Sequence, residues 1–283
     1  MPQDEASLIP DEPIPFSEMC SIIHSRITTF LAETPADWNC TDKEKKRLEN
    51  VQAQTRISLR VIEEALEKYS LDELSLSYNG GKDCLVLLVL YLAALHSKTL
   101  KSSNFRPTSL ECVFIQSSDP FEEVTKFVEK TSRQYNLNLS RYSAPMKGAL
   151  TDYLQEKPNV QAIFVGTRRT DPHGTYLTHF DRTDHGWPDF MRIHPVIDWH
   201  YVDIWTFICH LKIPYCCLYD QGYTSLGGTR DTHPNPKLLR IKLPETIENG
   251  KYTHLPDIWK NTSKYRPAWE LMDDEEERLG RDN

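Results

Sequence analysis

SLSYNGGKDC, residues 75–84, is the stretch that decides the fold class of this chain. The apolar residues before the two glycines suit a buried strand, and the apolar run Leu85–Leu95 after them suits a helix that Asp83 opens. Gly80 and Gly81 allow backbone conformations that a Cβ would hinder, so consecutive N–H groups can turn to one side and surround an anion. The positive end of the following helix adds to this attraction. The stretch therefore predicts a strand, a phosphate-binding turn and a helix.

The turn fits neither of two common nucleotide-binding patterns. Asp83 follows Gly80-Gly81-Lys82 where GxxxxGK[ST] requires Ser or Thr, and GxGxxG does not occur. The turn resembles instead the PP-loop of ATP pyrophosphatases, SGGxDS, whose members cleave ATP between its α and β phosphates. Asn79 stands in the place of the first serine and Cys84 in the place of the last. A glycine turn with only a structural purpose is the alternative interpretation.

Strands and helices alternate around this turn. We expect strands at Leu110–Ile115, Asn138–Tyr142, Val160–Val165 and His194–Ile197, and helices at Phe16–Leu31, Glu44–Tyr69, Phe121–Tyr135, Met146–Gln155, Trp199–Leu211 and Trp269–Leu279. Elements of this length in this order predict an α/β fold, a parallel sheet with helices on both faces. We divide the chain into an N-terminal leader with its helices (residues 1–70), a nucleotide-binding core (71–213) and a C-terminal extension (214–283).

Three polar segments directly follow predicted strands: Asn79–Asp83, Gln116–Asp119 and Gly166–Gly174. Ligands of such sheets bind beyond the carboxyl ends of the strands, where the strand order reverses. We therefore expect these segments to meet at one edge of the sheet and to form the ligand site.

The segment GTRRTDPHG (166–174) contains groups suited to phosphate and to a metal ion. The guanidinium groups of Arg168 and Arg169 are planar donors that match phosphate. Asp171, held in a turn by Pro172, could bind Mg²⁺ or a ring N–H. A surface loop with two solvated arginines is the alternative.

A second segment, DRTDHGWPDFMRIHPVIDW (181–199), places Trp187 and Phe190 among residues typical of loops. Such aromatics can cover a flat ring, and Asp184 can accept a hydrogen bond from an imide N–H, so the segment suits a flavin or a base. Packing of Trp187 in the core is the alternative. We expect Asp198 to cap the helix that follows.

The composition excludes several classes of protein. The 283 residues are 39% hydrophobic and 26% charged, as in an ordinary globular protein. A formal net charge of −8 argues against general binding to nucleic acid. The run Leu85–Leu95 is about half the length of a membrane span, and no secretory signal pattern is visible at the N-terminus. We expect neither a membrane nor a nucleic acid as partner.

The seven cysteines contain no CxxC pair. An odd number of thiols without metal-ligand spacing is typical of a cytoplasmic chain with mostly buried cysteines rather than of a disulfide framework. Cys216 and Cys217 are adjacent and could ligate a metal, but core packing is the better interpretation.

Together these segments resemble the eukaryotic FAD synthetases (FMN adenylyltransferases) of the PAPS-reductase-like group of PP-loop proteins. The matching motifs are SYNGGKDC (77–84), GTRRTDP (166–172), RTDHGWPDFMR (182–192), HPVIDWHYVDIW (194–205), LYDQGYTSLGG (218–228) and ERLGR (277–281). Asn79 in the glycine turn, together with RTDxxWPDF, selects this family over its relatives. The resemblance implies the reaction FMN + ATP → FAD + pyrophosphate with Mg²⁺. We expect a cytoplasmic monomer whose partners are small molecules.

The resemblance also implies roles for individual residues. The implied ATP site comprises Leu76, Ser77, Asn79, Gly80, Gly81, Asp83, Ile115, Gln116, Ile193 and Arg281. The implied FMN site comprises Gly166, Thr167, Arg168, Asp171, Asp184, His185, Gly186, Trp187, Pro188 and Arg278. Asn79, Asp83, Arg278 and Arg281 are the implied catalytic residues, and Asp83 and Asp171 are the implied Mg²⁺ ligands.

Two groups of relatives use thiols that this chain lacks. Phosphoadenylyl-sulfate reductases carry a cysteine in an ECGLH-like tail, whereas no cysteine follows Cys217 here. Iron–sulfur relatives have SxGCxxC where residues 225–230 contain no cysteine. Redox chemistry of either kind is disfavoured. Two other interpretations remain open: a PP-loop enzyme that adenylates a tRNA base, a carboxylate or a sulfur acceptor, and a flavin or nucleotide binder without catalysis.

Overall fold

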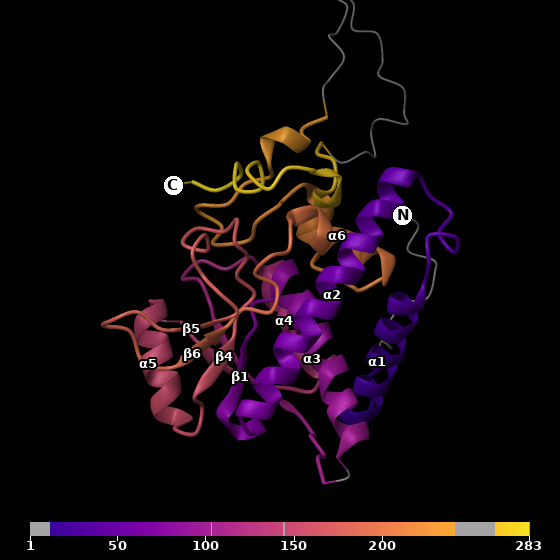
Figure 1. Cartoon of the computed structure of the whole chain (residues 1–283). Helices are drawn as coiled ribbons and strands as arrows, with labels where there is room; N and C mark the ends of the chain where they lie inside the picture. The colour runs from indigo at the N-terminus through magenta and orange to yellow at the C-terminus, as the bar shows by residue number, and fades with distance from the viewer. Residues whose placement is uncertain (1–11, 103, 144, 241–263, 283) are drawn as a thin grey trace, which may run out of the picture.

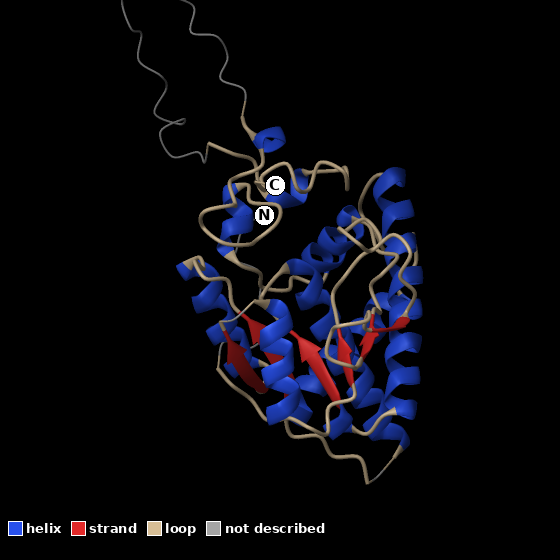
Figure 2. Cartoon of the chain, turned by 90° about the vertical axis from the view of Figure 1, so that its left-hand side faces the viewer, coloured by secondary structure: helices blue, strands red, loops and turns tan. Residues whose placement is uncertain are grey.

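The computed structural model describes residues 12–102, 104–143, 145–240 and 264–282. In this part of the chain a six-stranded sheet has the strand order β3-β2-β1-β4-β6-β5. The strands are β1 (Leu74–Ser77), β2 (Leu110–Ile115), β3 (Leu137–Tyr142), β4 (Ala162–Phe164), β5 (Phe180–Arg182) and β6 (Met191–Ile193). Figure 2 shows the strands side by side between helices, which confirms the α/β fold.

The sheet is mostly parallel. β3, β2, β1, β4 and β6 pair in parallel, and β5 alone runs antiparallel to its neighbour β6, which differs from the pairing expected for the whole sheet. The strand predicted at His194–Ile197 is wrong, because β6 ends at Ile193 and residues 195–198 form a turn. Pro195 has no N–H to donate to a neighbouring strand, so the hydrogen-bond ladder stops before it.

Helices cover both faces of the sheet. On one face lies α3 (Lys82–Lys101), with α1 (Phe16–Ala32), α2 (Asp42–Lys68) and α6 (Tyr201–His210) packed around it. On the opposite face lies α5 (Met146–Glu156), as Figure 1 shows. α4 (Glu122–Gln134) packs beside β3 on the side of α3, because its Val128 belongs to the same group of buried apolar side chains as α3. The helices predicted at α1, α2, α4, α5 and α6 are confirmed to within two residues at each end, and the helix predicted after the glycine turn is confirmed as α3, which continues beyond the apolar run to Lys101.

The central helix α3 is apolar on all sides because protein surrounds it. Its residues Leu85–Leu95 are almost fully buried between the sheet and helices α1 and α2. Among the described helices, α3 alone is long and apolar enough to cross a membrane, and the greater part of that stretch lies inside the protein.

One continuous group of buried apolar side chains joins the three segments into which we divided the chain. It includes Phe16 from the N-terminal helices, Leu76 from β1 and Leu271 from the C-terminal extension. A smaller group between the sheet and α5 includes Phe190, which is 4% exposed. The interpretation of Phe190 as a cover for a flat ligand is therefore wrong, since its ring is part of the core.

The helix predicted at Trp269–Leu279 is also wrong. A short 3-10 helix at Ala268–Glu270 is followed by a turn at residues 274–280. The acidic side chains of this turn have partners on other elements. The Asp274 carboxylate accepts from the N–H of Tyr201 at 2.6 Å, and Glu277 forms an ion pair with Lys82 at 2.5 Å. Both carboxylates also contact Arg168, so this segment folds against partners on other elements.

Asp198 does not cap α6, contrary to the prediction. The N-cap residue is His200, whose backbone N–H donates to the Asp203 carboxylate at 3.1 Å. Asp198 forms an ion pair with Arg169 at 2.7 Å instead. The first N–H of the helix, that of Tyr201, has the carboxylate of Asp274 as its acceptor.

A buried hydroxyl connects α2 with the turn after β6. Ser58 donates to the carbonyl oxygen of Pro195 at 2.7 Å and accepts from Nε1 of Trp199 at 2.9 Å. Ser58 is 0% and Trp199 1% exposed, so water cannot replace a lost partner.

Ser58→Ala removes both hydrogen bonds at once, so we expect the free energy of unfolding to fall by about 2–4 kcal/mol. Denaturant unfolding measures the change. As a control, Ser132→Ala removes a partly exposed hydroxyl of α4 that donates to Glu129 of the same helix, and should change stability by less than about 0.5 kcal/mol. Equal stability of the two variants would contradict the role given to Ser58.

Candidate active site

The strand order reverses at β1, which has β2 on one side and β4 on the other. A cavity of about 310 Å³ lies beyond the ends of β1 and β4. Its walls contain the predicted residues Ser77, Asn79, Gly81, Asp83, Gly166, Thr167, Asp171, Arg278 and Arg281. They also contain Lys82, Cys84, Met146, Val165, Pro172, Tyr219, Ser225, Leu226 and Glu277. A second cavity of about 460 Å³ lies between α2, α6 and residues 269–272, away from this group of polar side chains.

Two hydrogen bonds hold the turn 79–83, one within the turn and one to Tyr219. Oδ1 of Asn79 accepts from the N–H of Gly81 at 2.9 Å, and the hydroxyl of Tyr219 accepts from the N–H of Lys82 at 2.9 Å. The prediction that consecutive amides of this turn face an anion is therefore wrong for the N–H groups of Gly81 and Lys82, which donate to oxygens of the protein. The carboxamide NH₂ of Asn79 keeps its donors because the oxygen is the atom engaged in the turn.

Two glycines allow the loops to approach closely. Gly80 has a φ of 73°, and a Cβ there would lie 2.8 Å from Cγ2 of Val128. A Cβ on Gly166 would lie 3.0 Å from Sγ of Cys84. The loop after β4 therefore packs directly on the first turn of α3.

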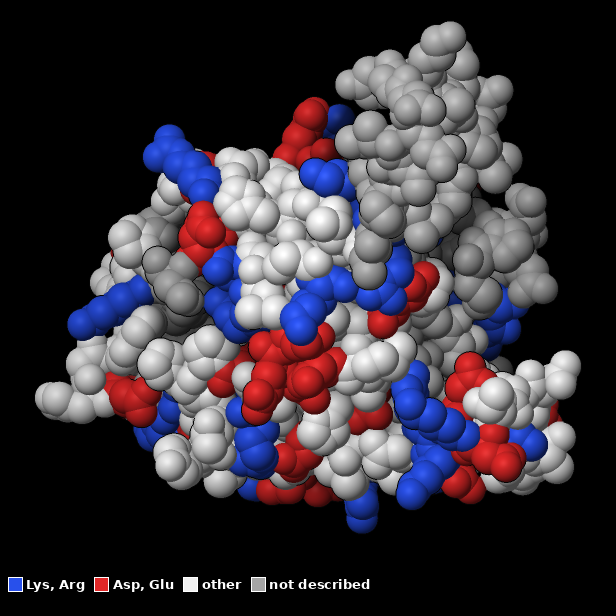
Figure 3. All heavy atoms as spheres, turned by 90° about the horizontal axis from the view of Figure 1, so that it is seen from above, with Lys and Arg blue, Asp and Glu red and all other residues white. Residues whose placement is uncertain are grey.

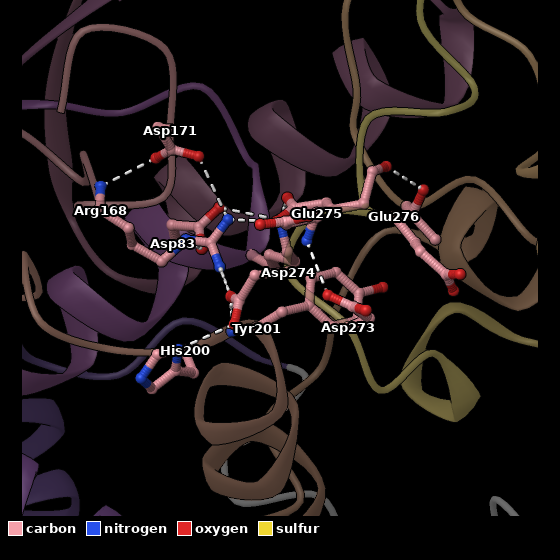
Figure 4. Close-up of polar contacts among 12 residues, drawn as sticks. Asp83, Arg168, Asp171, His200, Tyr201, Asp273, Asp274, Glu275 and Glu276 are labelled. Atoms are coloured by element: carbon pink, nitrogen blue, oxygen red, sulfur yellow. Dashed lines mark hydrogen bonds and ion pairs between the residues drawn. The ribbon is translucent and has the colours of Figure 1, made fainter. Parts of the chain in front are cut away.

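Arg168 is fully buried and forms ion pairs with four carboxylates. Its Nε lies 2.9 Å from Asp83, and its Nη2 lies 3.2 Å from Asp171. Its Nη1 lies 3.4 Å from Asp274, and Nη2 also contacts Glu277. Figure 4 shows Asp83 and Asp171 beside the guanidinium group, with Asp274 on its other side. The interpretations of the Arg168 side chain as a phosphate donor or as a solvated group are therefore wrong, since it lies wholly inside the protein.

Lys82 extends this buried cluster of charges. Its side chain is 3% exposed, and its Nζ lies 2.5 Å from Glu277 and 3.0 Å from Asp83. Burial would lower the pKa of Lys82, but Asp83 and Glu277 raise that pKa above its ordinary value. Burial would raise the pKa of Asp83, and the neighbouring Arg168 and Lys82 hold that pKa below its ordinary value. Both groups are therefore kept in their charged forms.

Arg278 and Arg281 reach the cavity from the C-terminal turn. Nη2 of Arg281 lies 3.2 Å from Asp231. A Cβ on Gly227 would lie 2.3 Å from the Arg281 guanidinium nitrogens, so the loop fits closely around this side chain. Among the described residues Arg278 has no carboxylate partner, which leaves its charge available to an anion.

Part of the predicted flavin site lies in the cavity wall. Gly166, Thr167, Asp171 and Arg278 line it, and Pro172 lies next to Asp171 there. The carboxylate of Asp171 also accepts from the backbone N–H of its own loop at Arg168. These residues thus lie together in the cavity wall, and their role toward FMN stays a prediction.

The rest of the predicted flavin site lies outside the walls of this cavity. Residues 184–188 form the turn of the β5–β6 hairpin. Trp187 is 40% exposed, and Asp184 lies 3.6 Å from Arg192. A Cβ on Gly186 would lie 3.9 Å from Nζ of Lys147. Lys147 is at the start of α5, next to Met146, which lines the cavity. The turn is thus close to the cavity, with an aromatic ring open to solvent.

The residues predicted to face adenine do not line the cavity. Leu76 and Ile193 are fully buried strand residues, so a ligand could reach only their main chain, as the resemblance implies. Ile115 ends β2, and the N–H of Gln116 donates to Tyr142 at 2.8 Å. The roles of these four residues stay predictions.

Sequence reasoning missed three members of the site: Lys82, Tyr219 and Glu277. Tyr219 lies in the motif LYDQGYTSLGG and Glu277 in ERLGR, and both motifs matched the family without a role for these positions. The two motifs therefore marked these positions as typical of the family. The contacts of Tyr219 and Glu277 could not be predicted, because their partners are far away in the sequence.

Known proteins share this arrangement. A family model described as "Phosphoadenosine phosphosulfate reductase domain" matches residues 73–152 and 143–234. "Probable FAD synthase" of Schizosaccharomyces pombe is 41% identical over 238 residues, which cover 84% of this chain and 82% of that protein.

Two solved structures resemble the chain over almost its whole length. Candida glabrata FMN adenylyltransferase in complex with FMN and the ATP analogue AMPCPP has a TM-score of 0.81 at 30% identity, covering 97% of this chain and 99% of that one. The same protein in complex with FAD and inorganic pyrophosphate has a TM-score of 0.81 at 31% identity, covering 96% and 98%. The sheet order and the loop after β1 thus define a PP-loop protein with a phosphoadenosine phosphosulfate reductase domain. Within that class, the chain belongs to the FAD synthase family.

The buried charges predict that two adjacent arginines, Arg168 and Arg169, contribute very differently to the free energy of unfolding. Arg168→Met leaves four carboxylates without their shared cation, so we expect a loss of about 3–5 kcal/mol in the free energy of unfolding. Arg169 is 42% exposed and pairs with an equally exposed Asp198, so Arg169→Met should lose no more than about 1 kcal/mol. Thermal or denaturant unfolding compares the two, and similar losses would show that the Arg168 cluster does not stabilise the fold.

Proposed function

We propose that this protein transfers the AMP part of ATP to FMN, giving FAD and pyrophosphate. The observation that carries the proposal is the convergence on one cavity of the Asn79 turn, the Asp171 loop and the two C-terminal arginines. Membership of the FAD synthase family supports it, and so do the Candida glabrata complexes with FMN and AMPCPP and with FAD and pyrophosphate.

The reaction needs alignment and charge neutralisation more than proton transfer. An oxygen of the FMN phosphate attacks the α-phosphorus of ATP, and a new P–O bond forms. The bond from that phosphorus to the α–β bridging oxygen breaks, and pyrophosphate leaves with the electron pair. A phosphate monoester is largely dianionic at neutral pH, since its second pKa is about 6. No strong general base is therefore required, and catalysis depends on position and electrostatics.

The turn at Asn79 receives the leaving pyrophosphate. Its oxygen is fixed by the N–H of Gly81, so the NH₂ group is presented as a donor in a set orientation. The start of α3 adds a partial positive charge behind the turn. Charge on the leaving group grows during the reaction, so these donors act more strongly on the transition state than on bound ATP.

The two C-terminal arginines balance the charge of the phosphates. Arg278 has no carboxylate partner among the described residues, and Arg281 shares its charge with Asp231. A guanidinium group can bind two phosphate oxygens at once. We assign Arg278 to the FMN phosphate and Arg281 to ATP.

The carboxylates fit a Mg²⁺ ion only in part. Oδ1 of Asp83 is buried and lies 2.9 Å from Nε of Arg168, and both Asp83 and Asp171 line the cavity. No group of three or more His, Cys, Asp or Glu side chains suited to a metal exists among the described residues. The ion would therefore be held mainly by ATP phosphates and water, with Asp83 or Asp171 as a protein ligand. When bound, it neutralises phosphate charge.

The flavin ring is assigned to the region between the cavity and the β5–β6 turn. Thr167 and Asp171 provide polar groups in the cavity wall, and the exposed ring of Trp187 can stack on an isoalloxazine. Asp184, which is exposed at its carboxylate, is the candidate acceptor for the imide N–H.

The setting of the reaction follows from the surface and the thiols. Acidic and basic side chains are interspersed on the face seen in Figure 3, and we propose small molecules as the substrates. All seven cysteines are free, as in a reducing compartment, which supports a cytoplasmic location. We propose that the protein acts as a monomer.

The direct test is FAD formation by the purified protein from FMN and Mg-ATP carrying a labelled α-phosphate. We expect labelled FAD and unlabelled pyrophosphate in equal amounts, and no product from riboflavin, which lacks the attacking phosphate. Binding of FMN without product would identify a non-catalytic flavin binder. AMP transfer to another acceptor without FMN binding would identify a different adenylating enzyme.

Asn79→Ala removes the donor to the leaving pyrophosphate, so we expect kcat to fall by about 10²-fold. The dissociation constant for FMN should stay within about threefold, because Asn79 acts on the other substrate. Asn138→Ala, which removes an exposed carboxamide from β3, serves as control and should leave both constants unchanged. Full turnover of Asn79→Ala would refute the assignment.

Gly227→Ala places a methyl group where the Arg281 guanidinium lies, 2.3 Å from its nitrogens. A side chain can move aside at small energetic cost, so we expect stability to change by less than about 1 kcal/mol while kcat/KM falls at least about tenfold. Gly148→Ala in α5 adds the same methyl group at an exposed helical position and should leave activity unchanged. Normal activity of Gly227→Ala would show that the position of Arg281 is not critical.

A further inference from the structure

The lysine of the phosphate-binding turn lines the cavity, but its charge is paired with buried carboxylates. Lys82 is 3% exposed, with Nζ between the carboxylates of Glu277 and Asp83 and 5.2 Å from the ring centre of Tyr201. A lysine beside paired glycines is an obvious phosphate ligand in sequence. Here its charge is already used inside the protein, so phosphate binding is left to other groups.

Glu277 is the carboxylate that joins this lysine to Arg168. Its side chain is 6% exposed, with one oxygen 2.5 Å from Nζ of Lys82 and the other in contact with Nη2 of Arg168. The two cations come from the first turn of α3 and from the loop after β4. Glu277 thus connects the C-terminal turn with both loops that wall the cavity.

The backbone around Glu277 is fixed from the opposite side. The hydroxyl of Thr224 donates to the carbonyl oxygen of Glu277 at 2.6 Å, and Nδ2 of Asn235 donates to that of Glu276 at 2.7 Å. Thr224 is 1% and Asn235 0% exposed. Two cations, Lys82 and Arg168, thus hold the carboxylate of Glu277. Two buried donors hold the carbonyl oxygens of Glu277 and Glu276, so the position of Glu277 is fixed.

The next residue along the chain is Arg278, and Arg281 follows within the same turn. Both line the cavity, as does Glu277, whose carboxylate is bound by Lys82 and Arg168. The direction in which the two arginines leave the backbone is therefore set by where Glu277 is anchored.

We propose that Glu277 is a positioning residue that locks the two C-terminal arginines to the phosphate-binding turn through Lys82 and Arg168. It needs no contact with either substrate. The inference rests on the proposed function, because it assigns the arginines to phosphates that react. Loss of the Glu277 charge should disturb the relation between the turn and the arginines, and hence turnover, while the flavin-binding residues of the β4 loop and the β5–β6 turn stay in place.

The test compares Glu277→Gln with Glu276→Gln in the full chain. Glu276 is the neighbouring residue but is 30% exposed and pairs with Lys237 at the surface. We expect Glu277→Gln to lower kcat by about 10- to 100-fold, with the dissociation constant for riboflavin, which lacks the phosphate assigned to Arg278, within about threefold of the parent when measured by fluorescence. Glu276→Gln should match the parent in both. A purely structural role for Glu277 would move both constants together, or neither.

A double-mutant cycle with Arg281→Ala tests the coupling itself. If Glu277 acts through the arginine, the losses in kcat of the two single variants should not multiply in the double variant. Losses that multiply would overturn the proposal. Parent protein is measured in the same FAD-forming assay, so absence of parent activity refutes the proposed function, whereas parent activity with an unaffected Glu277→Gln refutes only the positioning role.

A second variant covers the case in which Glu277→Gln does not fold. Lys82→Met combined with Glu277→Gln removes both charges, so no buried cation is left alone at that position, and three carboxylates remain around Arg168. We expect this protein to recover the thermal stability of the parent but not its kcat. Recovery of kcat together with stability would show that the pair serves the fold alone.

Discussion

The buried guanidinium group of Arg168 is the constraint on which the rest of this site depends. Asp83 from α3, Asp171 from the loop after β4, and Asp274 and Glu277 from the C-terminal turn all contact it. A buried cation is tolerable only when charged partners surround it, since an isolated one loses several kcal/mol of hydration. Burial of the Arg168 charge therefore requires α3, the loop after β4 and the C-terminal turn to be in place together. The sheet determines which loops lie at one edge, and Arg168 determines how those loops face one another.

Much of the fold could be predicted from residues that act locally. The strand, glycine turn and helix of residues 75–84 follow from alternation, from the conformational freedom of Gly80 and from the apolar run after it. Helical spacing in the sequence predicts five further helices to within two residues, because one buried face repeats along each of them. The meeting of Asn79 with Asp171 at one edge follows from the position of both segments after parallel strands.

The rest could not be predicted, because it depends on which distant partner a charged side chain finds. Arg168 and Arg169 are identical in type and adjacent, yet one is wholly buried and the other pairs with Asp198 at the surface. The acidic tail has helical composition but folds as a turn, since its carboxylates contact α6, Lys82 and Arg168. Phe190 and Trp187 differ in the same way: the ring of Phe190, directly before β6, lies in the core, whereas the hairpin turn leaves the ring of Trp187 partly in solvent. The local sequence pattern therefore predicts whether a segment forms a helix or a strand, but it does not predict which distant residues a side chain will contact.

Lys82 and Glu277 are 195 residues apart in the sequence, and this separation has a consequence during biosynthesis. A ribosome releases the strands and α3 well before residue 277 is translated, and N-terminal elements of a chain generally begin to fold first. At that stage the ammonium of Lys82 and the guanidinium of Arg168 lack a counter-ion that the finished molecule provides, so the sheet cannot close completely over them. The nascent chain must keep this end hydrated until the acidic turn emerges. Complete burial of Lys82 and Arg168 is thus reached only after the acidic turn has been translated.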